Sequence, residues 1–103
     1  MIDVRNIKHH FSSGTYVREM TLPKGYEVLT HSHNYDHLSI LSQGTALVYI
    51  GDIATEYHAG DIVEIKAHII HKIIAIEDIT WFCIHATEET DISKIDDVMS
   101  GKS

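Results

Sequence analysis

The sequence predicts an all-β fold, a small jelly-roll barrel with one short helix at its C-terminal end. From residue 15 onward the chain is a succession of short apolar or alternating runs rich in Val, Ile, Thr and Tyr, a pattern typical of strands. Turn-forming residues interrupt these runs about every 8–12 positions, as they do in all-β domains. A flat sheet of so many short strands would leave open edges, so we expect the strands to close into a barrel.

About eight strands follow one another in chain order. They are expected at residues 16–22, 26–30, 37–41, 45–50, 54–58, 61–65, 69–76 and 79–86. The breaks between them coincide with turn-forming residues. Pro23 and Gly25 suit a type I turn, Gly51 with Asp52 suits a two-residue hairpin loop, and Gly44 separates two further runs.

The N-terminal segment, residues 1–14, has a weaker pattern. It is apolar at Ile2, Val4, Ile7 and Phe11. Because the segment has no obvious hairpin partner, we expect it to pair across the two-fold axis of a homodimer, which would also enlarge a small core.

Residues 91–100 predict the short C-terminal helix. Its apolar residues recur at helical spacing behind an N-cap at Thr90 or Asp91; they are Ile92, Ile95, Val98 and Met99. A helix this short is marginal alone and must dock on the barrel.

Length and charge limit what the chain does. Its 103 residues suit a single domain covering residues 1–103, and 44% hydrophobic with 22% charged residues is typical of globular chains. Eight Lys and Arg against fifteen Asp and Glu give a net charge of −7. We therefore expect no nucleic-acid and no membrane partner.

Cysteine usage and the N-terminus indicate a cytoplasmic location. Cys83 is the one cysteine, so no internal disulfide can form. The first residues lack the basic-then-apolar order of a secretory signal. No apolar run approaches the roughly 18 residues that a membrane-spanning helix needs.

Histidine is the residue type that departs most from an average composition, with nine in the chain. His31 and His33 are separated by one residue, so an extended backbone directs both imidazoles to the same face. His37 opens the next strand after a turn, and His71 lies in a β-branched run much later. His31 and His33 can therefore share one metal ion, and a closed barrel can bring the strands that carry His37 and His71 together. Exposed or individually hydrogen-bonded histidines are the alternative.

The same residues carry a family resemblance. From Gly25 to Gly44 the chain resembles the first cupin motif, G-x5-H-x-H-x3-E-x6-G, in every spacing, with His37 in place of the usual Glu. Further along it is similar to the second motif, G-x5-P-x-G-x2-H-x3-N, at Gly60 and His71. The Pro, Gly and Asn of that motif are replaced by Lys66, His68 and Ala75.

The resemblance implies a cupin-type double-stranded β-helix with one divalent metal ion inside it. Carried over to this chain, the ligands are His31, His33, His37 and His71, as in a subset of small single-domain cupins with four histidines, one of which binds manganese. Mn and Fe are expected first, with Ni, Co, Cu or Zn as alternatives. Four neutral imidazoles leave the full 2+ charge on the ion, which favours anionic chelating substrates.

The resemblance and the open coordination positions of such an ion predict a metal-dependent oxidoreductase of the dioxygenase kind. Its substrate is expected to be a small chelating anion. A metal-dependent isomerase or lyase acting on a sugar-type or oxo-acid substrate, and a non-enzymatic small-molecule-binding cupin, are the alternatives. The sequence nominates no catalytic residue besides the ligands.

Four further residues are candidates for the cavity around the metal. Trp81, Cys83 and His85 share one face of the last predicted strand and either line the cavity or belong to the core. Arg18 can bind a substrate carboxylate in a bidentate way, although a solvated Arg is the more common case. His58 and His68 are expected at the surface or the rim, and the adjacent His9 and His10, which point to opposite faces of an extended segment, are not assigned to the site. Asp36 is expected as a turn residue or as a partner of an imidazole N–H.

Overall fold

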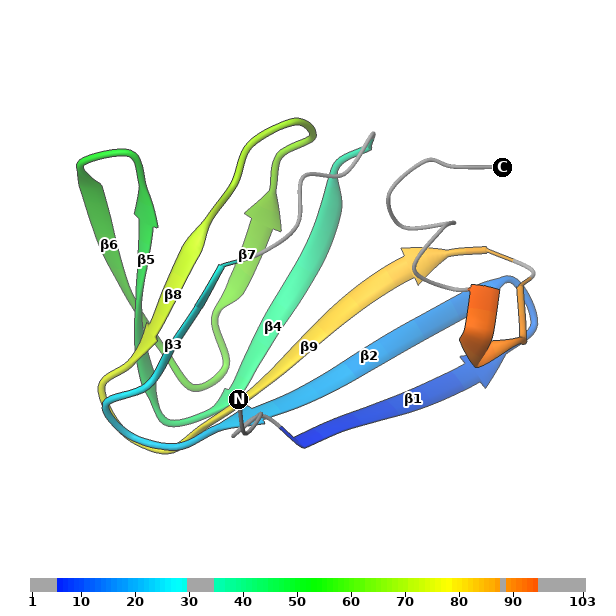
Figure 1. Ribbon diagram of the computed structural model, residues 1–103, viewed down its shortest axis with the longest axis horizontal. Coiled ribbons are helices and arrows are strands. Elements are labelled where there is room, and N and C mark those ends of the chain that lie inside the picture. The colour runs from blue at the N-terminus through cyan, green and yellow to red at the C-terminus, as the bar shows by residue number, and fades with distance from the viewer. Residues whose placement is uncertain (1–5, 30–34, 88, 95–103) are drawn as a thin grey trace.

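Two antiparallel sheets face each other and enclose the interior of the protein (Figure 1). The computed structural model describes residues 6–29, 35–87 and 89–94. The five-stranded sheet consists, in spatial order, of β1 (Asn6–Ser12), β2 (Thr15–Leu22), β9 (Ile79–Ala86), β4 (His37–Gln43) and β7 (Ile62–Ile65). The four-stranded sheet consists of β3 (Glu27–Leu29), β8 (Lys72–Ala75), β5 (Thr45–Ile50) and β6 (Ile53–His58). The predicted all-β jelly roll is confirmed.

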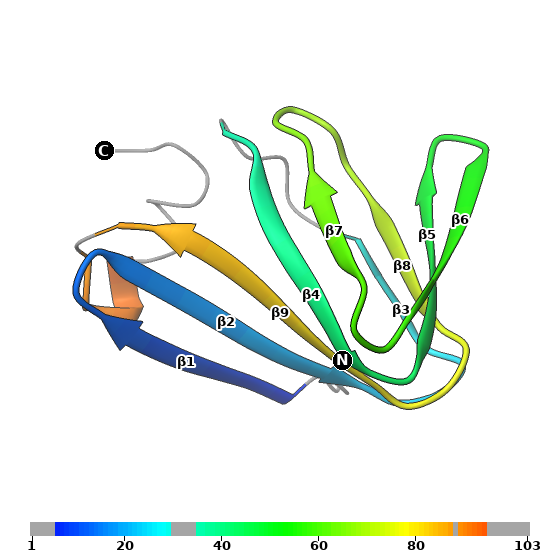
Figure 2. The same ribbon diagram turned by 180° about the vertical axis from the view of Figure 1, so that it is seen from behind.

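The two sheets converge at one end and splay apart at the other. At the converging end β2 leads to β3, β4 to β5, β6 to β7, and β8 to β9, so the chain crosses from sheet to sheet four times there (Figure 1). The splayed end carries the start of β4 and the connection from β7 to β8, as the view from behind also shows (Figure 2). His37 and His71 therefore both lie at the splayed end.

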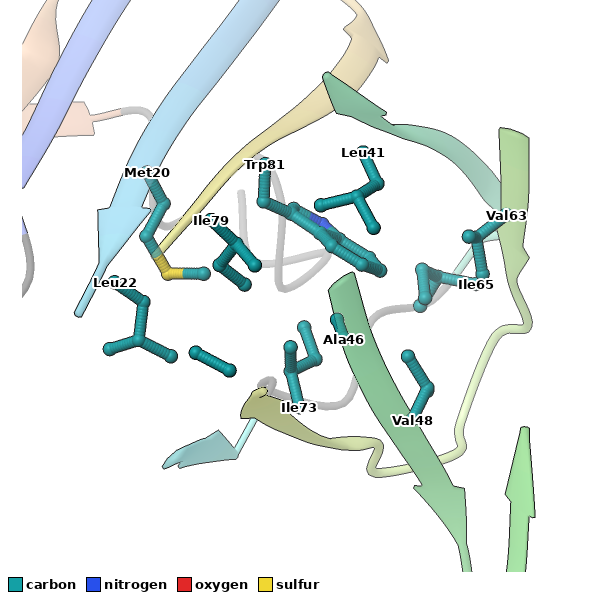
Figure 3. Close-up of a cluster of buried hydrophobic side chains, with 11 residues drawn as sticks. Met20, Leu22, Leu41, Ala46, Val48, Val63, Ile65, Ile73, Ile79 and Trp81 are labelled. Carbon is teal, nitrogen blue, oxygen red and sulfur yellow. The ribbon is translucent and has the colours of Figure 1, made fainter. Parts of the chain in front are cut away.

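The inward-facing apolar side chains form one core. Strand side chains alternate between two faces, and the inward set is almost fully buried: Met20, Leu22, Leu41, Ala46, Val48, Val63, Ile65, Ile73, Ala75, Ile79 and Trp81. Figure 3 shows the Trp81 indole between Leu41 of the five-stranded sheet and Ala46 of the four-stranded sheet. Because Trp81 is 1% exposed, its truncation to Ala would cost about 3–5 kcal/mol.

Strand register arranges the inward side chains of the five-stranded sheet in rows. One row is apolar and consists of Ile7, Met20, Trp81 and Leu41. The next row consists of His9, Arg18, Cys83, Ser39 and Val63. The row nearest the splayed end consists of Phe11, Tyr16, His85, His37 and Ile65. The interior thus changes from apolar to polar along the strands. We name the polar residues of the last two rows the polar end: His9, Tyr16, Arg18, His37, Ser39, Cys83 and His85.

The eight predicted strands are found with small shifts at their ends, and the described chain contains a ninth. Residues 6–12 form β1 and pair with β2 through a tight turn, Ser12 lying opposite Thr15. The expectation that the N-terminal segment lacks a hairpin partner is therefore wrong for these residues; residues 1–5 lie outside the described chain. The strand predicted at residues 69–76 is shorter and spans Lys72–Ala75. Residues 67 and 68 form a turn, and residues 69–71, which follow it, are not part of a strand.

The predicted C-terminal helix is represented by one helical turn, residues 92–94. Asp91 caps it, since its Oδ1 accepts hydrogen bonds from the Ser93 backbone N–H at 2.9 Å and from the Ser93 hydroxyl at 2.7 Å. Residues 95–100 of the predicted helix lie outside the described chain. Within the described residues, no helix is long and apolar enough to cross a membrane.

Candidate functional site

His37 and His71 bring two buried imidazoles to the splayed end from opposite sheets. His37 is the first residue of β4 and shares its inward face with Ser39 and Leu41; it is 7% exposed. His71 directly precedes β8, two residues before the core residue Ile73, and is 1% exposed. Strand alternation therefore directs both rings into the interior.

Backbone carbonyls hold the Nδ1 atoms of both rings. Nδ1 of His71 lies 3.1 Å from the Ile69 carbonyl oxygen, and Nδ1 of His37 lies 3.4 Å from that of Leu38. When Nδ1–H donates to a carbonyl, the lone pair of the neutral imidazole resides on Nε2. This is the tautomer that binds a metal through Nε2.

His85 lies directly beside His37. The two ring centroids are 4.5 Å apart, and His85 is 1% exposed. The hydroxyl of Tyr35 lies 3.0 Å from Nδ1 of His85, and the Tyr16 ring stacks on the other side of His85 at 5.9 Å. Burial raises the pKa of the Tyr35 phenol above its ordinary value, so Tyr35 is a neutral hydrogen-bond partner for His85.

Asp36 ties the start of β4 to the loop that carries His71. Its Oδ1 accepts a hydrogen bond from the Ala67 backbone N–H at 2.7 Å, and its Oδ2 lies 3.7 Å from Nζ of Lys66. The Ala67 N–H, followed by the nearby Lys66 ammonium, holds the pKa of the Asp36 carboxyl below its usual value. Asp36 was predicted to be a turn residue or the partner of an imidazole N–H. In the described residues it instead joins two loops at the splayed end.

Arg18 faces inward from β2, in a hydrogen-bonded group with Tyr16 and His9. The Arg18 Nε–H donates to the Tyr16 hydroxyl at 3.3 Å, and this hydroxyl lies 2.6 Å from Nδ1 of His9. Tyr16 is fully buried. The group therefore fixes the position of the Nε atom of the guanidinium within the polar end.

Cys83 and Ser39 complete the row that contains Arg18. The Ser39 hydroxyl donates to the Cys83 sulfur at 3.6 Å. Burial raises the pKa of the Cys83 thiol, while the Ser39 and Trp81 hydrogen bonds and the charge of Arg18 oppose it in smaller measure. Cys83 is accordingly a neutral thiol near neutral pH, and Trp81, one inward position further, belongs to the apolar core.

His31 and His33 lie outside the described residues. The chain that carries them leaves β3 at Leu29, which is paired with Lys72 next to His71. It rejoins the described chain at Tyr35, which contacts His85. Among residues 6–29, 35–87 and 89–94, no three His, Cys, Asp or Glu side chains are close enough to hold a metal ion.

Sequence reasoning did not single out Tyr16 and Ser39 of the polar end, or Tyr35 beside it, and it did not assign His9 to the site. β1 pairs with β2 so that His9 lies opposite Arg18 on the inward face. The available signal was the alternation of Ile7, His9 and Phe11, which indicates one face of a strand. His58 is exposed, as expected, and contacts Glu56; His10 points to the face opposite His9, as adjacent residues of a strand do, and contacts Glu19.

An open hollow of about 470 Å³ borders His37. It is lined by Tyr35, Asp36, His37, Leu38, Ile84 and Ala86. Leu38, its neighbour Ile84 on β9, and Ala86 occupy outward positions of the five-stranded sheet. The hollow therefore lies on the outer face of that sheet, beside the start of β4, and not inside the polar end.

The fold and the site define a small double-sheet β protein with buried histidines at one end, and comparison with known proteins identifies its family. A family model described as "Cupin domain" matches residues 18–85, so the chain belongs to the cupin family. No curated protein matches the chain. Solved structures with the same fold share little sequence with it.

Three such structures illustrate the likeness. A cupin superfamily protein from Desulfitobacterium hafniense has 19% identity and a TM-score of 0.70, covering 80% of this chain and 76% of that one. Ectoine synthase from P. lautus has 14% identity and a TM-score of 0.74, covering 96% and 76%. Salicylate 1,2-dioxygenase from Pseudoaminobacter salicylatoxidans has 12% identity and a TM-score of 0.72, covering 81% and 25%. At these identities the likeness concerns the fold.

Proposed function

We propose that this chain is a metal-dependent cupin oxidoreductase of the dioxygenase kind, acting on a small chelating anion. The observation that carries the proposal is the pair of buried imidazoles, His37 and His71, at the splayed end of the sheets. Dioxygenase chemistry occurs on this fold, as the name of the similar salicylate 1,2-dioxygenase states.

The donor set fits a divalent transition metal. Imidazole suits Mn, Fe, Co, Ni, Cu and Zn, whereas Mg and Ca prefer oxygen ligands. The carbonyl contacts of His37 and His71 favour the tautomer with a basic Nε2. In this proposal His31 and His33, from the first cupin motif, complete the ligand set, and Mn or Fe is the metal.

The chain's own residues position the substrate and exclude water. A bound Mn or Fe ion would supply Lewis acidity toward substrate oxygens and one-electron redox chemistry. The apolar row with Met20, Trp81 and Leu41 closes the inner side of the polar end. The Tyr35 hydroxyl contacts Nδ1 of His85 and the Tyr16 ring stacks on the His85 ring, so that a substrate would meet a preorganised polar wall.

Metal binding by single variants tests the ligand assignment. We expect His37→Ala and His71→Ala to lose most of the affinity for Mn²⁺, measured by titration calorimetry and by metal content after dialysis. His37→Glu should keep a site, because the family usually carries Glu there. His10→Ala and His58→Ala are matched controls on exposed positions and should bind as the wild type does. Full occupancy in both His37→Ala and His71→Ala would place the ion elsewhere.

Oxygen uptake tests the reaction class. The Mn- or Fe-loaded chain should consume O₂ with at least one member of a panel of 1,3-dicarbonyls, catechols and 2-oxo acids. His71→Ala should lose this activity. No turnover with either metal, together with tight sugar binding, would indicate a non-enzymatic binding cupin instead.

A homodimer is part of the same proposal. β1 is the outermost strand of the five-stranded sheet in the described chain and pairs with β2 on one side. Its other edge can add a strand from a second copy across a two-fold axis. Light scattering at micromolar concentration should give twice the mass of the chain, and a monomeric mass would contradict the proposal.

A further inference from the structure

The outer face of the five-stranded sheet carries an apolar strip across its central strands. β9 and β4 direct only uncharged side chains outward: Thr80, Phe82, Ile84, Ala86, Leu38, Ile40 and Ser42. Val17 of β2 lies opposite Ile84. Ile62 of β7 lies opposite Ile40. We name the apolar residues that adjoin one another here the outer strip: Val17, Leu38, Ile40, Ile62, Phe82 and Ile84.

The outer strip departs from the pattern of a sheet face that meets water. Antiparallel strands with one solvated face commonly direct polar side chains to that face. The four-stranded sheet follows this rule, with Glu27, Lys72 and Glu56 on its outer face. In the outer strip, by contrast, Leu38 is 49% and Ile62 is 63% exposed. A contiguous apolar patch that is rimmed by polar residues marks an interaction surface.

The strand carboxylates beside the outer strip are paired on the face itself. They are Glu19 and Glu64 in the described part of the chain. Nε2 of His10 lies 2.9 Å from Glu19, and the Lys66 ammonium lies 2.9 Å from Glu64. Two copies with a net charge of −7 each repel one another over much of their surface, so they approach best through a face such as this one.

Strand register makes the outer strip match a second copy of itself. One row of the face contains Val17, Ile84 and Leu38, on β2, β9 and β4. A two-fold axis along β9 reverses this row, so that Val17 of one copy meets Leu38 of the other and Ile84 meets its counterpart. The hollow beside the start of β4 is lined in part by Leu38 and Ile84 and offers a recess for the facing side chains.

We propose that a second copy of this chain packs face to face on the outer strip, across a two-fold axis that runs along β9. β2 and β9 have eight residues each, so a face of five strands spans roughly 20 by 25 Å, or about 500 Å² on each copy. Both copies together reach about 1,000 Å², the size at which specific interfaces begin. The inference rests on the homodimer of the proposed function and names the outer strip, rather than the free edge of β1, as its contact surface.

The oligomeric state of two surface variants tests this inference. Sedimentation equilibrium of the full chain at micromolar concentration should show a dimer. Leu38→Glu and Ile62→Glu each place a carboxylate without a partner in the apolar contact, and each should raise the dimer dissociation constant roughly 30-fold or more. Both side chains are exposed in the single chain, so the variants should fold, which circular dichroism checks. If one of them does not fold, the other decides.

Matched controls make the same changes away from the outer strip. Leu29→Glu and Ile53→Glu alter exposed positions of the four-stranded sheet and should leave the dimer as stable as in the wild type. Leu38→Met keeps an apolar side chain of similar volume at the contact and should keep the dimer as well. The charge change is identical in the Glu variants of both sheets, so a difference between them reports the face and not the net charge.

The outcomes separate this inference from the rest of the proposed function. Dimers that persist in both Leu38→Glu and Ile62→Glu would overturn it and leave the homodimer to another surface, such as the edge of β1. Dissociation of Leu29→Glu to the same extent would overturn it too. A monomeric wild type would refute the inference and the homodimer together, and an equal fall in Tm in Leu38→Glu and Val98→Glu would then assign the outer strip to the C-terminal segment. Metal binding and O₂ uptake, tested with the histidine variants, are independent of all these results.

Discussion

At the scale of single residues, His68 explains a departure from the second cupin motif. It stands where the motif has Gly, and its φ of 64° lies in the left-handed region. That region costs most L-residues roughly 1–2 kcal/mol, and Gly adopts it freely. The motif Gly thus reflects a backbone requirement that this chain meets with an exposed His, one of the residue types that tolerate it better.

Replacing His68 with Gly should therefore stabilise the protein or leave it unchanged. We expect a gain of up to about 1 kcal/mol, since relief of the left-handed strain exceeds the extra entropy of an unfolded Gly. Ala67→Gly, at the neighbouring position in the same turn, keeps the N–H that Asp36 accepts and should lose about 0.5–1 kcal/mol. Urea unfolding of both variants checks this, and an equal loss in both would contradict it.

Cys83 should make the protein less stable at alkaline pH. Burial raises the pKa of its thiol above the ordinary value of 9.0, so the folded state favours the neutral thiol. The stabilisation is fully present below the unfolded pKa and is lost as the pH rises through the folded pKa. Tyr35 has a shift of the same sign, so the comparison must isolate the thiol.

Thermal unfolding of the wild type and of Cys83→Ala between pH 7 and pH 11 isolates the contribution of the Cys83 thiol to stability. Cys83→Ala should be less stable than the wild type at pH 7, because it leaves a cavity. The difference should shrink as the pH rises above about 9, since only the wild type loses the thiol contribution. A constant difference across this range would show that the thiol is not the titrating group.

At the scale of elements, the crossovers between the sheets depend on Gly44. Gly44 joins β4 to β5 with a φ of +85°. A Cβ there would overlap the Asp78 carbonyl oxygen and come within 2.9 Å of Cγ2 of Ile79. The crossover from β4 to β5 therefore packs directly on the one from β8 to β9, which accounts for the Gly at the end of the first cupin motif.

Gly44→Ala should consequently be far more damaging than Gly51→Ala. Gly51, in the β5–β6 hairpin, has a φ of +59°, but a Cβ there would meet nothing within 4 Å. We expect about 1–2 kcal/mol for Gly51→Ala, from backbone strain alone. Gly44→Ala adds displacement of a backbone carbonyl and should cost about 3 kcal/mol or more. Similar losses in chemical unfolding would contradict the close approach.

Sequence patterns predict most strands of this fold but not all of the contacts between them. The strands from β2 to β9 follow alternation and turn residues, so local chemistry predicts them. β1 was missed because Lys8, His9 and His10 interrupt its apolar pattern, and its pairing depends on β2. The group of His9, Tyr16 and Arg18 was missed for the same reason: a register between strands brings it together, and no motif spacing encodes a register.

At the scale of the whole molecule, polar and apolar residues divide the interior between its two ends. The converging end is closed by packing around Trp81. The splayed end holds His37 on the five-stranded sheet and His71 beside the four-stranded sheet. Asp36 joins the loops there through Ala67 and Lys66. In the proposed function, a metal ion bound by both histidines would add a second link between the sheets at the end that has less apolar packing.

Metal should therefore stabilise the fold as a whole. A ligand that binds the folded state alone adds about 2.7 kcal/mol at a free concentration 100-fold above Kd, which corresponds to a rise in Tm of roughly 10 °C or more for a domain of this size. We expect thermal unfolding with Mn²⁺ to show this rise over the EDTA-treated chain. His37→Ala and His71→Ala should each lose the metal-dependent part, while the exposed His58→Ala should keep it, because in the proposed site the first two residues are ligands and His58 is not. A wild-type Tm that stays the same with Mn²⁺ or Fe²⁺ as with EDTA would contradict the proposed link and the site itself.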